Sequence, residues 1–157
     1  MSIQKPKMIL FDYGHTLLYE IGHNAEKGNK VIYQYIKSNP KNISFQEFNK
    51  IVNSTFKKIN ECGNGIDICE KNFLRLVYGY MNIELSVSLE EAESIIWNGV
   101  SECDIMPNAN KILDYLNKND IRSGVISNMC WSGKSLQDRL NRLLPNNKLE
   151  FAITSGD

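Results

Sequence analysis

A carboxylate stands where a short apolar run of the chain gives way to glycine and small polar residues. The run is Met-Ile-Leu-Phe at residues 8–11, and Asp12 follows it directly. Apolar runs of this length that end in turn-forming residues are typical of buried strands. A carboxylate held rigidly at the end of such a strand can attack phosphorus or carbon and form a covalent intermediate. Asp12 is therefore the first candidate catalytic residue.

Two more apolar runs end in the same way. Residues 124–126 lead into Ser127 and Asn128, and residues 151–154 lead into another serine and glycine. In an open sheet of parallel strands, ligands bind at the carboxyl ends of the strands. We therefore expect Asp12 and Ser127 to face the same site.

Helices are predicted between these strands. Leu136, Leu140 and Leu143 recur at helical spacing, with Arg139 expected on another face, and a similar helix starts at Pro107. Strands that alternate with helices of this length favour parallel pairing through right-handed crossovers. The predicted fold class is therefore α/β, with a parallel sheet.

A long block, residues 20–104, interrupts this pattern with helices and shows no strand-like alternation. A helix through residues 31–36 should end before Pro40. We divide the chain into an α/β core of residues 1–19 and 105–157 and a helical insert between them. Three helix starts in the insert are marked by capping sequences, namely Ser44-x-x-Glu47, Asp67-x-x-Glu70 and Ser88-x-x-Glu91.

Two segments carry a family resemblance. Residues 9–18, Ile-Leu-Phe-Asp-Tyr-Gly-His-Thr-Leu-Leu, resemble the first signature of the haloacid dehalogenase (HAD) superfamily, an apolar strand followed by Asp-x-Asp-x-Thr-Leu. Residues 124–128, Gly-Val-Ile-Ser-Asn, resemble its second signature, in the form frequent among members with a helical cap. The insert lies where that subclass places its cap. The resemblance implies the N-terminal part of a HAD-like hydrolase, with a Rossmann-like core and an inserted α-helical cap domain.

The resemblance also implies a magnesium-dependent phosphatase that acts on a small phosphorylated metabolite through an aspartyl-phosphate on Asp12. Magnesium would be bound by the Asp12 carboxylate and the backbone carbonyl of Gly14. Phosphate would contact the Ser127 hydroxyl and nearby groups including Asn128, while Thr16 would support the site. Phosphoryl transfer needs such cations and donors, because its transition state spreads negative charge over the phosphate oxygens.

Gly14 departs from the family pattern, which has a second aspartate here to protonate the leaving group and later activate water. Such an acid or base contributes about a hundred- to ten-thousand-fold. Glycine therefore favours a leaving group that is already a stable anion, a replacement acid, or loss of activity. His15 is the nearest replacement, since imidazole titrates near neutral pH, although a loop histidine that only packs or meets water is the alternative. His23 could also face the site from the hinge of the insert.

Three other functions fit the same residues. A 2-haloacid dehalogenase needs no proton donor, but its usual Asp-x-Tyr-Gly-Thr places tyrosine one position later than Tyr13. A catalytically impaired HAD-like binding protein would keep the same fold. A phosphonatase-type hydrolase needs a cap lysine, and nothing distinguishes the insert's Lys27, Lys30, Lys57, Lys58 and Lys71.

The composition limits the partners. Eighteen basic residues balance 18 acidic ones, so no uniform field favours nucleic acid or an anionic membrane surface. No apolar run is long enough to span a membrane, and the four irregularly spaced cysteines are typical of reduced cytosolic thiols. We therefore expect a cytoplasmic protein whose partner is a small phosphorylated substrate.

Two later features of the family have no counterpart before Asp157, namely a lysine after the third strand and an acidic pair after the fourth. The third apolar run ends only a few residues before that position. We therefore expect the C-terminal part of the core to be supplied by a continuation of the chain or by a second chain. Its strands would lie beside residues 8–11.

Overall fold

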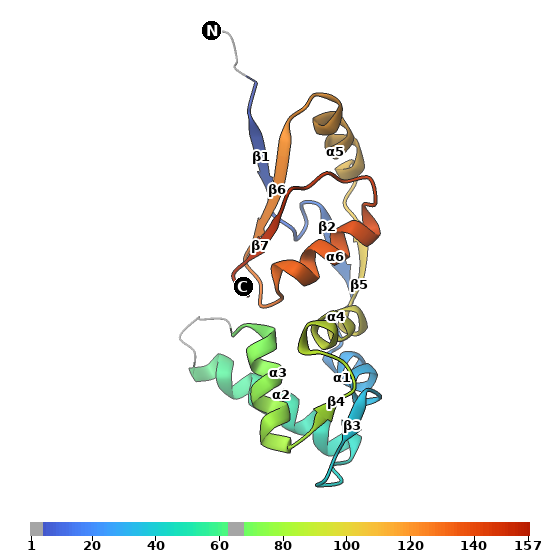
Figure 1. Cartoon of the computed structure of the whole chain (residues 1–157), viewed down its shortest axis with the longest axis vertical. Coiled ribbons are helices and arrows are strands. Elements are labelled where there is room, and N and C mark those ends of the chain that lie inside the picture. The colour runs from blue at the N-terminus through green and yellow to red at the C-terminus, as the bar shows by residue number, and fades with distance from the viewer. Residues whose placement is uncertain (1–4, 63–67) are drawn as a thin grey trace.

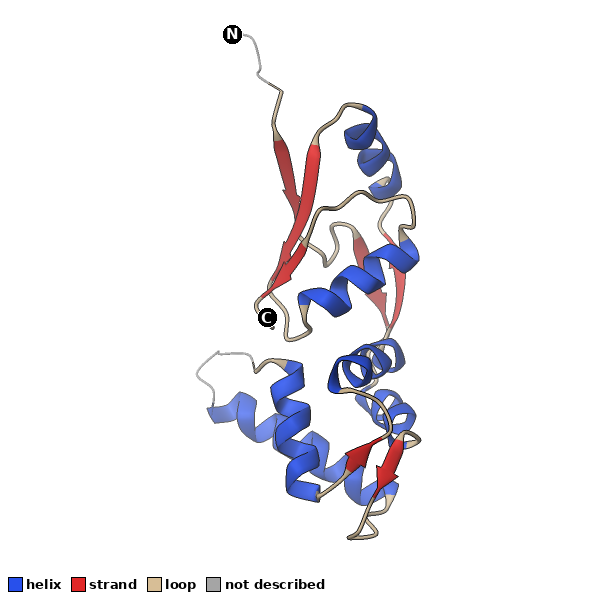
Figure 2. Cartoon of the chain, in the orientation of Figure 1, coloured by secondary structure: helices blue, strands red, loops and turns tan. Residues whose placement is uncertain are grey.

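The computed structural model describes residues 5–62 and 68–157, and these form a mixed α/β fold (Figures 1 and 2). Its main sheet has three strands in the order β1 (Met8–Phe11), β6 (Arg122–Ser127) and β7 (Ala152–Thr154). Both pairs of neighbours are parallel. The expected α/β class, the three strands and their parallel pairing are thus confirmed.

Two helices cover one side of this sheet. Helix α5 (Ala109–Lys118) precedes β6 and helix α6 (Gly133–Leu143) follows it, as their apolar spacing predicts. Figure 1 shows both helices on the same side. Val125 of β6 is fully buried there, in one cluster with Leu113 of α5 and Leu136 of α6. This packing fixes the carboxyl ends of β1 and β6 relative to each other.

The opposite face of the sheet carries apolar side chains that are about half exposed. Leu10 is 53% exposed, and Ile126 and Ile153 are each 48% exposed. The expectation that β1 is a buried strand is therefore wrong for the described residues, because β1 is an edge strand and only one of its faces packs against helices. The expected additional strands beside β1 stay a prediction.

Four short strands correct the expectation that residues 20–104 contain none. Strands β2 (Leu18–Ile21) and β5 (Glu102–Ile105) form an antiparallel pair, and β3 (Ile36–Ser38) pairs with β4 (Glu84–Leu85). The β2–β5 pair leads into and out of a group of helices below the sheet (Figure 1). Strands of two to four residues are too short to show a period of two along the sequence.

The helices below the sheet form what we call the helical lobe. The predicted helix through residues 31–36 ends earlier than expected, because α1 stops at Tyr33 and β3 begins at Ile36. The helices of the lobe are α1 (Ala25–Tyr33), α2 (Phe45–Cys62), α3 (Glu70–Met81) and α4 (Leu89–Val100).

The capping predictions have different outcomes. Ser88 and Glu91 form the full reciprocal capping box of α4, with bonds of 3.2 and 2.9 Å. Ser44 accepts a hydrogen bond of 3.3 Å from the amide of Glu47 at the start of α2. Asp67 lies outside the described residues, and Cys69 occupies the N-cap position of α3.

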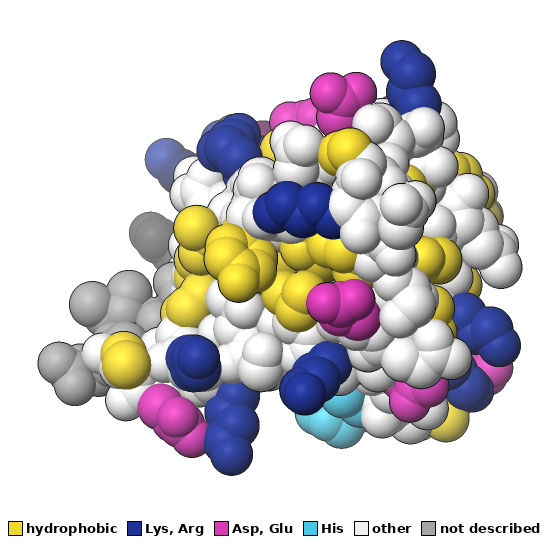
Figure 3. Space-filling view, turned by 90° about the horizontal axis from the view of Figure 1, so that it is seen from below, with side chains coloured by type: hydrophobic (Ala, Val, Ile, Leu, Met, Phe, Trp, Pro, Cys, Tyr) yellow, Lys and Arg dark blue, Asp and Glu magenta, His cyan; other side chains and the backbone are white. Residues whose placement is uncertain are grey.

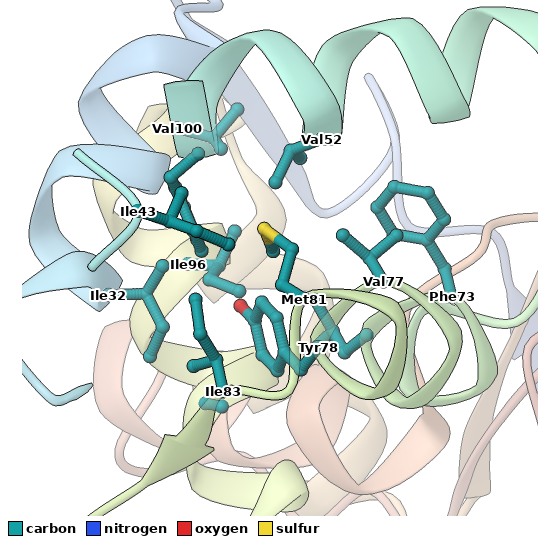
Figure 4. Packing of buried hydrophobic residues seen from close by; sticks show 13 residues of the cluster. Ile32, Ile43, Val52, Phe73, Val77, Tyr78, Met81, Ile83, Ile96 and Val100 are labelled. Carbon is teal, nitrogen blue, oxygen red and sulfur yellow. The ribbon is translucent and has the colours of Figure 1, made fainter. Parts of the chain in front are cut away.

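One apolar core holds the helical lobe together (Figure 4). Ile32 of α1, Phe48 of α2, Met81 of α3 and Ile96 of α4 are buried in it. The end of the lobe seen in Figure 3 shows a band of hydrophobic side chains bordered by both basic and acidic ones. In the described part of the chain, no helix combines the length and hydrophobicity needed to cross a membrane.

Candidate active site

A cleft of about 380 Å³ opens at the carboxyl ends of β1 and β6. The hydroxyl of Ser127 donates a hydrogen bond of 2.7 Å to Oδ1 of Asp12 across these neighbouring strands. The parallel pairing therefore brings the two residues together as the sequence predicts. We call this space the Asp12 cleft; its walls are formed by Asp12, Tyr13, Gly14, His15, Tyr19, Glu20, Trp97, Ser127, Asn128, Met129 and Trp131.

A tight turn after β1 holds Asp12 in place. The carbonyl of Tyr13 accepts hydrogen bonds from the amide of Leu17 at 3.1 Å and from that of Leu18 at 3.3 Å. Both leucine side chains are fully buried in the cluster that contains Val125 of β6 and Leu136 of α6, so the turn is anchored in the core between the sheet and its helices. His15 adopts a left-handed backbone conformation with φ of 55°, which lets the chain reverse here.

The predicted site residues do not all line the cleft. Asp12, Gly14, His15 and the Ser127–Asn128 pair do so. Thr16 is exposed, and its hydroxyl donates to the Gly14 carbonyl at 3.5 Å, a position from which it can only support the turn. His23 lines a different cavity, within the helical lobe.

Few groups in the cleft can exchange protons or hold an anion. Burial, followed by the hydrogen bond to Cys103, raises the pKa of the Tyr13 phenol, so this side chain keeps its proton. His15 is the one histidine among the described residues of the walls. No lysine or arginine lies among the described residues of the walls. Lys134, at the start of α6, instead pairs with Asp138 on the surface.

The cleft offers few oxygen ligands for a metal ion. Asp12 supplies one carboxylate and Gly14 one backbone carbonyl, while the other carboxylate of the walls, Glu20, accepts hydrogen bonds from Arg139 and Trp97. Across residues 5–62 and 68–157 no three His, Cys, Asp or Glu side chains gather as a metal site. Magnesium usually keeps several waters and is held by one or two carboxylates together with substrate phosphate. The residues present therefore fit a magnesium ion that arrives with, and is shared by, a phosphorylated substrate.

A buried cation beside the cleft was not expected from the sequence. Arg139 of α6 is 3% exposed, although we expected it to face away from the apolar stripe. Its guanidinium donates to Oε1 of Glu20 at 2.9 Å and to the Trp97 carbonyl at 3.1 Å, and it lies 3.9 Å above the Trp97 ring. The indole nitrogen of Trp97 also donates to Glu20, at 2.7 Å. These bonds connect β2, α4 and α6 at the wall of the cleft.

We predict that Arg139→Leu lowers the free energy of unfolding by about 3 kcal/mol, because it removes the positive charge that Glu20 pairs with and the donor shared by two backbone carbonyls. Chemical denaturation measures the change. Arg142→Leu is the matched control, since Arg142 is exposed and donates to the side chain of Asn98; we expect it to change stability by less than about 0.5 kcal/mol. Equal effects of the two variants would contradict a structural role for Arg139.

A second buried charge holds the loop that follows β6. Glu93 of α4 is fully buried and accepts bonds from the Ser132 amide at 2.7 Å, the Ser132 hydroxyl at 2.5 Å and the Ser135 hydroxyl at 2.8 Å. The amide of Gly133 donates to Asp157 at 2.8 Å. Two carboxylates of the protein therefore already satisfy the first amides of α6, and this helix start is not open to a phosphate.

A third buried charge, Glu70, lies at the start of α3 and is 7% exposed. Desolvation by burial, and secondly the negative charge of Glu93, raises the pKa of Glu70 from 4.5 to about 7. The folded protein then holds a proton that the unfolded chain releases, so the stabilisation is complete below pH 4.5 and is lost as the pH rises through about 7.

We therefore predict that Glu70→Gln, which stays uncharged, raises the free energy of unfolding by on the order of 3 kcal/mol near pH 8 and changes it little near pH 4. Thermal unfolding at a series of pH values measures the difference. Glu90→Gln removes an exposed carboxylate of α4 and is the control. A variant whose stability follows the same pH profile as the wild type would show that Glu70 does not titrate abnormally.

Comparisons with known proteins do not identify the family. No protein-family model matches this chain, and the search of curated proteins also finds no match. The functional assignment therefore depends on the residues of the cleft and their geometry.

Proposed function

We propose that the chain carries the nucleophile of a HAD-like hydrolase, a magnesium-dependent phosphatase that acts on a small phosphorylated metabolite. In this proposal residues 1–19 and 105–157 belong to a Rossmann-like core, and residues 20–104 form an inserted helical cap. The proposal takes the protein to be cytoplasmic.

One observation carries the proposal. The Asp12 carboxylate and the Ser127 hydroxyl, 115 residues apart, meet at 2.7 Å at the carboxyl ends of adjacent parallel strands, inside a cleft of about 380 Å³. A nucleophilic carboxylate needs a rigid position, and a phosphate needs a hydrogen-bond donor beside it. Asp12 supplies the carboxylate and Ser127 supplies the donor, and one hydrogen bond joins the two side chains.

The proposed reaction has two steps. A carboxylate oxygen of Asp12 attacks phosphorus, the bond to the leaving oxygen breaks, and an aspartyl-phosphate forms on Asp12. Water then attacks the phosphorus of this intermediate and loses a proton to solvent, the bond between phosphorus and the Asp12 oxygen breaks, and inorganic phosphate leaves the restored carboxylate. Ser127 donates to a phosphate oxygen in both steps, after its hydroxyl turns from Asp12 to the substrate.

Magnesium would be held by the Asp12 carboxylate and the Gly14 carbonyl, where it would neutralise charge on the phosphate oxygens. The side chain at position 14 is not needed for a carbonyl ligand. Thr16 keeps the turn in shape through its bond to that carbonyl, and Asn128, next to Ser127 in the lining of the cleft, would also contact the phosphate.

We predict a strong dependence on the leaving group, because position 14 has no carboxyl to protonate it. An aryl or acyl phosphate should be hydrolysed more than about a hundredfold faster than a sugar phosphate, with no turnover when magnesium is chelated. Initial rates with a series of substituted phenyl phosphates and one sugar phosphate measure the dependence.

A flat dependence would contradict this prediction and indicate that His15 supplies the proton. His15→Asn distinguishes the two cases, because asparagine tolerates the left-handed backbone conformation at this position. If no residue protonates the leaving group, the variant should hydrolyse every substrate at the wild-type rate. If His15 protonates it, the variant should hydrolyse sugar phosphates more slowly and aryl phosphates at an unchanged rate. Absence of any magnesium-dependent hydrolysis would favour a binding protein instead.

A further inference from the structure

A second cavity, of about 170 Å³, lies among the helices of the helical lobe. All four lobe helices contribute to its walls, and Trp131 from the loop after β6 lines both this cavity and the Asp12 cleft. Figure 4 labels four of its apolar lining residues, Val52, Phe73, Ile96 and Val100. An apolar cavity of about 150 Å³ is large enough to bind benzene, so this space accommodates one small ring or a short branched chain.

Glu70 gives this apolar cavity an acidic group. Within the described part of the chain it is the one acidic side chain on the cavity walls, and it is 7% exposed. The neighbouring Glu93 accepts three hydrogen bonds from the Ser132 and Ser135 groups. Charging a buried carboxylate is costly, and a ligand that brings a positive charge and hydrogen-bond donors offsets this cost.

Two asparagine side chains of the cavity walls present further hydrogen-bond acceptors. The side-chain nitrogens of Asn29 and Asn53 both donate to Oδ1 of Asn49, at 2.8 and 3.2 Å. Their own side-chain oxygens accept no hydrogen bond from the described residues, and both asparagines line the cavity. Three acceptor groups from α1, α2 and α3 therefore border one apolar space.

We propose that this cavity binds a small organic ammonium compound, with the ammonium group on Glu70 and Asn29 and the apolar body against Phe73, Ile96 and Trp131. A primary ammonium group offers three N–H donors and a positive charge, which matches a carboxylate and two amide oxygens. A carboxylate or phosphate ligand would meet acceptors and a like charge. This site is independent of the phosphatase activity proposed for the Asp12 cleft.

The binding should depend on pH through Glu70. The pKa of this carboxyl is about 7 in the empty cavity, so an ammonium ligand must displace its proton at lower pH. The titratable groups around Glu70 are Glu93 on α4, Tyr78 on α3, and His23 and Cys130 in loops of the cavity wall.

Isothermal titration of the whole chain with benzylamine tests the proposal, with benzyl alcohol as the neutral probe of the same shape. Above about pH 7.5 we expect benzylamine to bind at least tenfold more tightly than benzyl alcohol, because its hydrogen bonds are charge-assisted. Between about pH 5 and 7 its association constant should fall close to tenfold per unit of decreasing pH. Tryptophan fluorescence gives a second readout, since Trp131 lines the cavity.

Three variants locate the effect. Glu70→Gln should bring the affinities of the two probes within about twofold and remove the pH dependence, while Glu90→Gln on the exposed face of α4 should change neither. His23→Gln should leave the dependence in place if Glu70 is its source. Equal affinity of both probes for the wild type, a pH-independent affinity for benzylamine, or no binding of benzylamine would each overturn the proposal, whatever the stability of the variants.

Discussion

Asp12→Asn should abolish phosphatase turnover, lowering it by more than about a thousandfold, while the chain stays folded. Asparagine has nearly the same shape, and its side-chain oxygen can still accept the 2.7 Å hydrogen bond from Ser127. It is a far weaker nucleophile, so the covalent step fails although the cleft is preserved. Initial rates with an aryl phosphate at saturating magnesium measure the loss, and circular dichroism checks the fold.

The matched control for this variant is Asp138→Asn. Asp138 is an exposed aspartate that pairs with Lys134 on α6, away from the cleft walls. The control carries the same change of charge and should retain full activity. If Asp12→Asn kept more than about a tenth of the wild-type rate, Asp12 would not be the nucleophile.

Gly14→Asp should raise the hydrolysis of poor leaving groups by about a hundredfold, because it supplies the proton donor that position 14 lacks. The structure leaves room for the change. A Cβ atom built at Gly14 meets no atom within 4 Å, and the backbone there is not in the left-handed region that favours glycine. Rates for a sugar phosphate should gain most, and those for aryl phosphates least.

Gly14→Asn is the control at the same position, since it has the same shape as the aspartate variant and no acid. It should leave the rates for sugar phosphates unchanged. Equal gains in the two variants would show that the effect comes from side-chain bulk, and no gain in either would show that protonation of the leaving group does not limit the rate.

Much of the sheet could be predicted from the sequence. Each of the three main strands is an apolar run that ends at a polar residue, and parallel pairing follows from the helices between them. The meeting of Asp12 with Ser127 could be predicted for the same reason. The four short strands could not, because pairs such as β2 with β5 depend on residues more than 80 positions apart and span too few residues to show alternation.

The buried charges share a sequence signal that is easily overlooked. Glu70, Glu93 and Arg139 each stand within an apolar stripe at helical spacing, as Glu93 does before Ile96 and Trp97. When only apolar residues are counted, such positions are assigned to the solvent-facing side of the helix. The expected orientation of Arg139 is wrong for this reason. Their partners, however, lie on other elements, so the bonds between Arg139, Glu20 and Trp97 follow only from the tertiary structure.

The most direct test of the proposed mechanism is chemical trapping of the intermediate on Asp12. The wild-type chain is mixed with an aryl phosphate and magnesium, quenched, and reduced with borohydride, which converts an aspartyl-phosphate but not a free carboxylate into homoserine. Peptide mass spectrometry should locate homoserine at position 12, in high yield because Gly14 provides no base to speed the second step. Hydrolysis of the substrate with no modification at position 12 would contradict the account.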